Sequence, residues 1–301
     1  MTEGAERMYP EFASVTRGRI ASLALAAALA ALAGCGGNDS GPAAPPGAGD
    51  PGPVHAHGLG IDPKDGALLV ATHTGLFRAP PGETRMERVG ERMQDTMGFT
   101  VVGPNTILGS GHPDGRDELP PFLGLIRSDD GGRSWRPVSL LGKRDFHVLE
   151  AEGRRVYGYG SDFATRSSGF LVSDDGGRSW EQREVPEPLV ALALDPADAD
   201  RLIASGVRAL HVSDDGGRRW RPLEGPPGLL AWGESLIVVD AGGTVHRAED
   251  PPDRLRPVGD VGGAPAALDV GQSDDLYLAL HDGTVKRSVD GGAGWSVRAA
   301  P

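Results

Sequence analysis

Ser128-Asp-Asp-Gly-Gly-Arg-Ser-Trp135 is repeated along the chain, and this repetition decides the fold. Ser173-Asp-Asp-Gly-Gly-Arg-Ser-Trp180 is identical, and Ser213-Asp-Asp-Gly-Gly-Arg-Arg-Trp220 differs at one position. Ser288-Val-Asp-Gly-Gly-Ala-Gly-Trp295 keeps the serine, one aspartate, the glycine pair and the tryptophan. The copies begin 45, 40 and then 75 residues apart, which leaves room for a degenerate copy, Ala248-Glu-Asp-Pro-Pro-Asp. Repeats at this interval predict one domain built from similar supersecondary units.

Each copy has the composition of a tight turn. Glycine adopts positive φ without steric cost, and an aspartate carboxylate can accept hydrogen bonds from N–H groups of its own turn. The tryptophan is then the first large side chain of the next strand, where it can pack on a neighbouring unit. We therefore expect structural roles for Ser128, Asp130, Gly132, Trp135, Ser173, Asp175, Gly177, Trp180, Ser213, Asp215, Gly217, Trp220, Ser288, Asp290, Gly292 and Trp295.

The repeated pattern S-x-D-x-G-x-S/T-W resembles the Asp-box, or BNR repeat, of sialidases, sortilin-type receptors and photosystem-assembly propellers. The resemblance implies that each copy, called a box below, closes the turn between the third and fourth strands of a β-propeller blade. It also implies a sialidase-like glycoside hydrolase as one possible activity. Asp-boxes occur in catalytic and non-catalytic propellers alike, so the boxes do not decide between these functions.

Residues 54–301 divide into six units of about 41 residues, the size of a four-stranded propeller blade. The first unit contains four short apolar runs separated by turn residues, at 59–61, 67–72, 76–79 and 85–89. Later units begin near Met97, Phe146, Leu189, Leu229 and Ala266. We predict an all-β, six-bladed propeller, with a seven-bladed ring or an eight-stranded sandwich as alternatives. The sequence does not indicate how the ring closes.

Residues 1–34 have the pattern of a bacterial lipoprotein signal peptide. Thr16-Arg-Gly-Arg19 precedes an uncharged apolar run at 20–33, which is too short to span a bilayer permanently but suits a secretory signal. Leu32-Ala-Gly-Cys35 resembles the lipobox, in which the signal is cut before the cysteine and the thiol is lipid-modified. A plain signal peptide or a buried Ala-rich helix is the alternative.

Residues 35–53 contain Gly, Pro and Ala with almost no large apolar side chain, and we predict a flexible tether. Lipidation of Cys35 followed by this tether would place the domain outside the cytoplasm, anchored to the bacterial cell membrane or envelope. A net charge of −12 and the lack of a Lys/Arg run argue against a nucleic-acid partner. Cys35 is the only cysteine, so no internal disulfide forms.

Histidines gather at one predicted rim of the propeller. When strands alternate in direction, the start of the first strand and the end of the second share a rim, and the boxes lie at the other. Six of the eight histidines map to the first rim, His281 among them. The candidate ligand- or metal-binding residues are His55, His57, His73, His112, His147, Asp95 and Asp114.

Imidazoles beside carboxylates can hold Zn²⁺ or Cu²⁺, or can hydrogen-bond a polar ligand. The alternative is that they brace the loops of the rim. The longest predicted loops, 113–123 and 161–168, rise from the same rim, and binding residues are often found on such loops. We therefore predict a rim that binds a ligand, a metal or a protein partner.

A sialidase-like centre needs three arginines, an acidic residue and a tyrosine activated by a glutamate, as the resemblance implies. No predicted first strand begins with arginine, and Glu150 is the only plausible partner for Tyr157 or Tyr159. We name no catalytic residue and favour a binding protein. A sialidase-like glycoside hydrolase is the alternative, and a purely structural spacer of the envelope is a third hypothesis.

Overall fold

The computed structural model describes residues 51–248 and 254–301, which form six four-stranded antiparallel sheets. Within these ranges there is no helix long and apolar enough to cross a membrane. The strands are β1 (Ala56–Ile61), β2 (Leu68–Thr72), β3 (Gly75–Ala79), β4 (Glu87–Arg88), β5 (Asp95–Gly103), β6 (Thr106–His112), β7 (Leu125–Ser128), β8 (Arg136–Ser139), β9 (Arg144–Glu152), β10 (Arg155–Asp162), β11 (Ser168–Ser173), β12 (Glu181–Arg183), β13 (Leu189–Asp195), β14 (Asp198–Gly206), β15 (Leu210–Ser213), β16 (Arg221–Leu223), β17 (Gly228–Trp232), β18 (Leu236–Asp240), β19 (Thr244–Ala248), β20 (Leu255–Asp260), β21 (Pro265–Val270), β22 (Leu276–Leu280), β23 (Val285–Ser288) and β24 (Ser296–Ala299).

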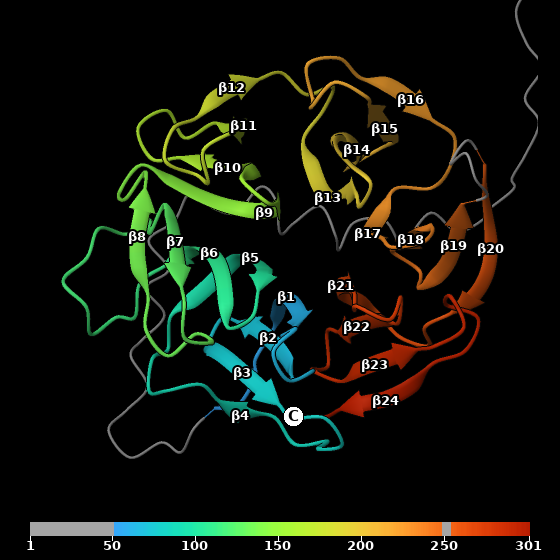
Figure 1. Cartoon of the computed structure of the whole chain (residues 1–301), viewed down its shortest axis with the longest axis horizontal. Helices are drawn as coiled ribbons and strands as arrows, with labels where there is room; N and C mark the ends of the chain where they lie inside the picture. The colour runs from blue at the N-terminus through green and yellow to red at the C-terminus, as the bar shows by residue number, and fades with distance from the viewer. Residues whose placement is uncertain (1–50, 249–253) are drawn as a thin grey trace, which may run out of the picture. The chain divides into compact units, whose positions relative to one another are not determined.

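Each sheet consists of four strands that follow one another in the chain. The first strand of each sheet lies near the centre of the ring and the fourth lies at its outer edge (Figure 1). The prediction of a six-bladed propeller is confirmed, and the seven-bladed and sandwich alternatives are wrong. The five later blades begin within two residues of their predicted starts. The prediction was close because it placed each start at an apolar residue that follows a turn.

The apolar core lies between the blades rather than within one central mass. The described residues form six clusters of buried side chains, and each cluster draws its members from two neighbouring blades. Phe146 of the third blade packs with Leu125 of the second, and Phe77 of the first blade shares a cluster with Tyr277 of the sixth. Each blade therefore stabilises its neighbours by burying apolar area against them.

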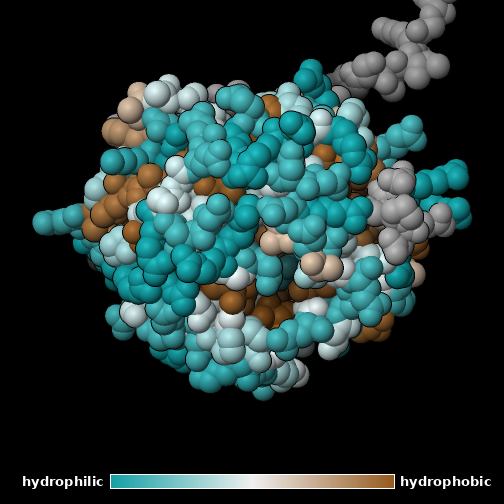
Figure 2. Space-filling view, turned by 45° about the horizontal axis from the view of Figure 1, so that its top comes forward, coloured by the Kyte–Doolittle hydropathy of each residue, from teal (hydrophilic) through white to brown (hydrophobic). Residues whose placement is uncertain are grey.

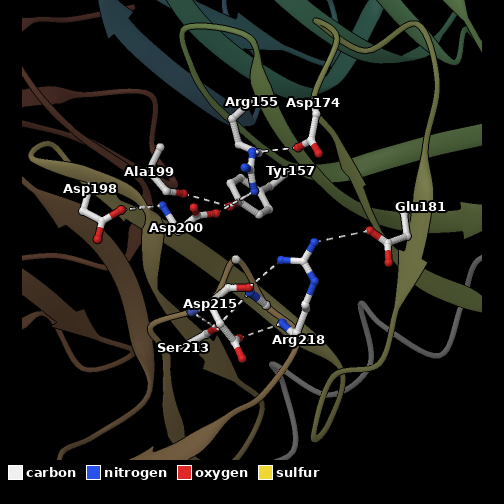
Figure 3. Close-up of polar contacts among 12 residues, drawn as sticks. Arg155, Tyr157, Asp174, Glu181, Asp198, Ala199, Asp200, Ser213, Asp215 and Arg218 are labelled. Carbon is white, nitrogen blue, oxygen red and sulfur yellow. Dashed lines mark hydrogen bonds and ion pairs between the residues drawn. The ribbon is translucent and has the colours of Figure 1, made fainter.

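Hydrogen bonds within each box hold its turn. Ser128 Oγ donates to Asp130 Oδ1 at 2.8 Å and accepts the Gly132 N–H at 2.8 Å. Asp130 Oδ1 also accepts the Ser134 N–H at 2.9 Å. The corresponding serine–aspartate bond recurs in the other three boxes, and Figure 3 shows it between Ser213 and Asp215. The carboxylate of Asp130, like those of Asp175, Asp215 and Asp290, is thus hydrogen-bonded within its own turn.

The second glycine of a box contacts the preceding blade. Gly132 has a φ of +91°, and a Cβ atom on it would lie 2.1 Å from Cδ2 of Leu76 in the first blade. Gly177 approaches Leu125 in the same way. Trp135 packs in the cluster that contains Leu76, so the box joins its own blade to the previous one. The degenerate copy at 248–253 lies almost wholly outside the described residues.

Arg298 of β24 closes the ring by contacting the first blade. Its guanidinium donates to the carbonyl oxygens of Ala79 at 3.0 Å, Pro80 at 2.9 Å and Glu83 at 2.6 Å. Ala300 N donates to Thr84 O at 2.9 Å. The first blade has Ala79-Pro-Pro-Gly where the others have a box, and this segment receives the end of the chain. Closure therefore needs no strand shared between two blades.

Candidate functional site

The antiparallel order of the strands brings six histidines to one rim of the propeller. His57 lies in β1 and His147 in β9, both near the start of an inner strand. His73, His112 and His281 lie at or just after the ends of β2, β6 and β22, and His55 directly precedes β1. We call this region the histidine rim: His55, His57, His73, His112, His147 and His281, with the carboxylates Asp95 and Asp145.

His57, His73 and Asp95 form a compact cluster. His57 Nε2 lies 3.1 Å from His73 Nδ1, which lies 2.9 Å from Asp95 Oδ2. Asp95 Oδ1 lies 3.4 Å from His57 Nε2, and this buried oxygen accepts no hydrogen bond from the described residues. One ligand atom from each of the three residues falls within 4.8 Å of the other two. Two imidazole nitrogens and a carboxylate oxygen thus lie close together.

Irregular backbone at His55 and His57 sets the directions of their side chains. The pairing of β1 with β2 shifts register between Ala56 and Gly58, so His57 lies in a bulge, which redirects side chains. His55 has a φ of +57°, uncommon for a residue other than glycine. Its ring stacks on His73 with the centroids 5.1 Å apart and lies 5.2 Å from that of His281. His55 therefore connects His57, His73 and His281 into a group of four neighbouring imidazoles.

Charge–charge contacts shift the pKa values in this cluster. Burial raises the pKa of Asp95, but its contacts with His57 and His73 outweigh that effect and hold the pKa well below its ordinary value. The hydrogen bond to Asp95 raises the pKa of His73. Burial, together with the neighbouring imidazoles, lowers the pKa of His55. Asp95 therefore remains a carboxylate at neutral pH, and His55 favours the neutral form that can bind a metal.

A second carboxylate, Asp145, lies between His112 and His147. Asp145 Oδ2 is 3.0 Å from His147 Nε2 and 3.4 Å from His112 Nε2. The Asp145 side chain is 3% exposed, and its Oδ1 accepts no hydrogen bond from the described part of the chain. Burial lowers the pKa of His147, but the hydrogen bond to Asp145 and the nearby charge of Asp95 leave it raised. Asp95 is thus close enough to influence His147.

Sequence reasoning missed Asp145 because the third blade was expected to start at Phe146, one residue later. The spacing Asp145-x-His147 was the available signal, since alternate residues of a strand share a face.

Asp114 does not join either cluster. Its buried carboxylate accepts hydrogen bonds from Met93 N at 2.8 Å and from the backbone and guanidinium of Arg116. Asp114 therefore braces the loop after β6.

A channel of about 680 Å³ runs between the inner strands and reaches His57 and His147. Most of the lining residues have apolar side chains, and Figure 2 shows a hollow with hydrophobic side chains inside it on an otherwise mostly hydrophilic face. Two carboxyl groups, Glu150 and Asp269, line the channel. Burial raises the pKa of Asp269 to about 7, and burial together with the charge of Asp269 raises that of Glu150. No described lining residue is arginine or lysine.

Tyr157 is the cross-strand partner of Glu150 in the pairing of β10 with β9, but its hydroxyl is hydrogen-bonded elsewhere, unlike that of a sialidase-like nucleophile. Its hydroxyl donates to the carbonyl oxygen of Ala199 at 2.8 Å (Figure 3). Arg155, beside it, forms ion pairs with Asp174 and Asp200 in the same view. These groups connect the third and fourth blades.

Comparison with known proteins finds likeness only at the level of structure. No protein family and no curated protein sequence matches the chain. A GH74 enzyme from Niastella koreensis superposes with a TM-score of 0.60 and 12% identity, over 83% of this chain and 46% of that one. A gluconolactonase from Xanthomonas campestris superposes with a TM-score of 0.60 and 14% identity, over 76% of this chain and 84% of that one. YCF48 bound to D1 peptide superposes with a TM-score of 0.45 and 16% identity, over 67% of each chain. The chain thus spans less than half the length of the GH74 enzyme, and the two superpositions with a TM-score of 0.60 establish the propeller fold.

Proposed function

We propose that this protein is a lipid-anchored Asp-box propeller that binds a transition-metal ion, Zn²⁺ or Cu²⁺, through His57, His73 and Asp95. One observation carries the proposal: the ligand atoms of the three residues lie within 4.8 Å of one another. Two ligands on a tetrahedral zinc ion, with bonds of about 2.0–2.1 Å, lie about 3.3 Å apart. The distance of 3.1 Å between His57 Nε2 and His73 Nδ1 and that of 2.9 Å between His73 Nδ1 and Asp95 Oδ2 are close to that spacing.

The hydrogen-bonding needs of the cluster support a cation. Asp95 is a carboxylate, so it can only accept, and each neutral imidazole has one N–H and one lone pair. The same nitrogen of His73 faces both Asp95 and His57, so one proton there cannot satisfy every contact. A metal ion would accept a lone pair from each residue and would also neutralise the buried Asp95 Oδ1.

Metal content tests this function. We would purify the full-length chain in detergent without chelator or affinity tag, load it with Zn²⁺ or Cu²⁺, and measure bound metal by elemental mass spectrometry. The His57→Ala/His73→Ala double variant should lose an ion that the parent holds. His246→Ala is the matched control, because His246 also contacts a carboxylate, Asp240, at 3.1 Å but lies outside the rim. A parent that binds no ion after loading would overturn the proposal.

Anchoring through Cys35 is part of the same proposal and rests on the lipobox-like sequence alone. The segment before β1 contacts the histidine rim: Thr74 Oγ1 donates to Gly52 O at 2.6 Å and His73 N donates to Val54 O at 3.2 Å. The described part of the chain therefore enters the propeller beside this rim. Cys35→Ser should move the protein from the membrane to the soluble fraction, and unchanged membrane association would contradict anchoring.

A sialidase-like glycoside hydrolase remains a weaker candidate. Recognition of a sugar carboxylate calls for arginines, and the described channel lining contains none. Hydrolysis of fluorogenic sialosides that is lost on changing Glu150 or Asp269 would favour this alternative over a metal-binding protein.

A further inference from the structure

We propose that a pocket between the sixth and first blades binds a small monocarboxylate with an aliphatic chain through Tyr277, Arg287 and Arg298. The pocket has a volume of about 490 Å³, within the range of small-molecule sites. These three residues line it from the sixth blade, and Pro81 and Gly82 line it from the first. No residue of the histidine rim is among its described lining residues, so the site goes beyond the metal-binding function proposed above.

The pocket lies at the junction where a box is missing. In the blades that have a box, its second glycine packs against the preceding blade, as Gly132 does against Leu76. The first blade has Ala79-Pro-Pro-Gly instead, so no box tryptophan of this blade packs against the sixth. Two residues of that segment, Pro81 and Gly82, line the pocket. The shorter segment therefore leaves room for a ligand.

Strand pairing brings polar side chains to one face of the sixth blade. Tyr277 of β22 is the direct partner of Arg287 in β23, and Arg287 is the direct partner of Ser296 in β24. Direct partners share a face of a sheet, so these three side chains are neighbours. The pairing of β23 with β24 skips Arg298, which therefore lies in a bulge, and bulges redirect side chains. All four residues line the pocket.

The Tyr277 hydroxyl points to a ligand. Tyr277 is 8% exposed, and its ring packs in the apolar cluster shared by the sixth and first blades. Its hydroxyl forms no hydrogen bond within the described residues, yet it is not among their fully buried polar atoms that lack a partner, so it is open to the pocket. Buried tyrosine hydroxyls usually have a partner, and that of Tyr157 donates to Ala199 O. An acceptor on a ligand would complete Tyr277 in the same way.

The charges in the pocket favour a ligand with one negative charge. Arg287 donates to Asp275 Oδ2 through Nε at 3.0 Å and also through Nη2. Arg298 contacts backbone carbonyl oxygens and forms no ion pair within the described residues. Burial, reinforced by the positive charge of Arg287, lowers the pKa of Arg298. Two guanidiniums and one carboxylate leave a single excess positive charge, which one carboxylate on the ligand would balance.

The unused donors and the apolar lining define the ligand further. A guanidinium has five N–H groups, so the three bonds that Arg298 makes leave donors for a ligand beside the Tyr277 hydroxyl. Ile61, Pro81 and Val297 supply apolar surface in the same pocket, and Val297 is 59% exposed. An aliphatic chain would cover this surface and gain from its burial.

Calorimetric titration with hexanoate tests the site. The full-length chain in non-ionic detergent, without added metal ion, is titrated with hexanoate, hexanamide and inorganic phosphate beside a detergent blank. We expect one hexanoate per chain and no binding of hexanamide, which has the same chain without the charge. Tyr277→Phe removes only the hydroxyl and should weaken hexanoate binding about tenfold, as loss of a hydrogen bond to a charged group does. Tyr157→Phe is the matched control and should bind as the parent does, because that hydroxyl is bonded at another junction.

Asp275→Asn should change the affinity in the opposite direction. It removes the carboxylate that competes for Arg287, so hexanoate should bind more tightly than to the parent. A purely structural role of Asp275 would not produce this gain, and thermal unfolding would verify that each variant folds. Three results would overturn the proposal: no binding of hexanoate at millimolar concentration, equal affinity of the parent and Tyr277→Phe, or tighter binding of phosphate than of hexanoate.

Discussion

Gly132 of the second blade lies so close to Leu76 of the first that a Cβ atom on the glycine would be 2.1 Å from Cδ2 of the leucine. The same glycine has a φ of +91°, so two independent constraints exclude a side chain there. Its neighbour Gly131, with a φ of +73°, would place a Cβ no closer than 3.5 Å to the nearest side-chain atom. The two glycines of the box are therefore needed for different reasons.

We expect Gly132→Ala to lower the free energy of unfolding by about 3 kcal/mol, from positive φ together with overpacking. Gly131→Ala is the matched control and should lose only about 1 kcal/mol, because it meets the backbone penalty alone. Chemical denaturation of both variants measures the difference. Equal losses would show that Leu76 moves aside without cost.

Arg298 offers a test of ring closure. Arg298→Ala removes the donors to Ala79, Pro80 and Glu83 and should destabilise the propeller by about 2 kcal/mol, since hydrogen bonds from charged groups are among the stronger ones. Arg136→Ala, on the outer strand of the second blade, removes only an exposed ion pair with Asp129 and should cost less than about 1 kcal/mol. Thermal unfolding that responds equally to both changes would argue against closure through Arg298.

The raised pKa of Asp269 predicts that the stability of the protein depends on pH. Its pKa is raised to about 7 in the folded protein, so between about pH 4 and pH 7 the folded state binds more protons than the unfolded state. Stability due to this group is therefore lost as the pH rises through that window. We expect Asp269→Asn to be more stable than the parent at pH 8, by about 1–3 kcal/mol, and the gain to vanish near pH 4. A gain that is independent of pH would refute the assignment.

His73 predicts a pH dependence of metal binding. A protonated imidazole cannot bind a metal, and the hydrogen bond to Asp95 raises the pKa of His73 above its ordinary value. Zn²⁺ affinity should therefore fall as the pH drops through that raised pKa, and the fall should begin above pH 6.5. Calorimetric titration between pH 5.5 and 8 measures it. An affinity that is constant across this range would contradict His73 as a ligand.

The boxes helped to predict the number of blades because the interactions that define each box lie within a short stretch of sequence. The serine–aspartate bond and the positive φ of the glycine pair lie within a few residues, so the pattern of letters is sufficient to recognise them. The histidine rim was predictable in part, because the alternation of strands assigns strand ends to a rim whatever the exact packing. Asp145 was not predicted as a site residue, because including it required the start of the third blade to be placed correctly to within one residue.

By itself, the sequence determined a ring of six similar four-stranded blades and the rim at which the histidines collect, since repeat length and strand alternation follow from short-range patterns. Only the tertiary structure decided that Asp95 meets His73 and Asp145 meets His112, because each pair joins two blades through their relative position. The tertiary structure also decided that the Asp114 carboxylate accepts a hydrogen bond from Met93 N. Contacts between blades depend on how neighbouring sheets pack, and no local spacing of residues encodes them.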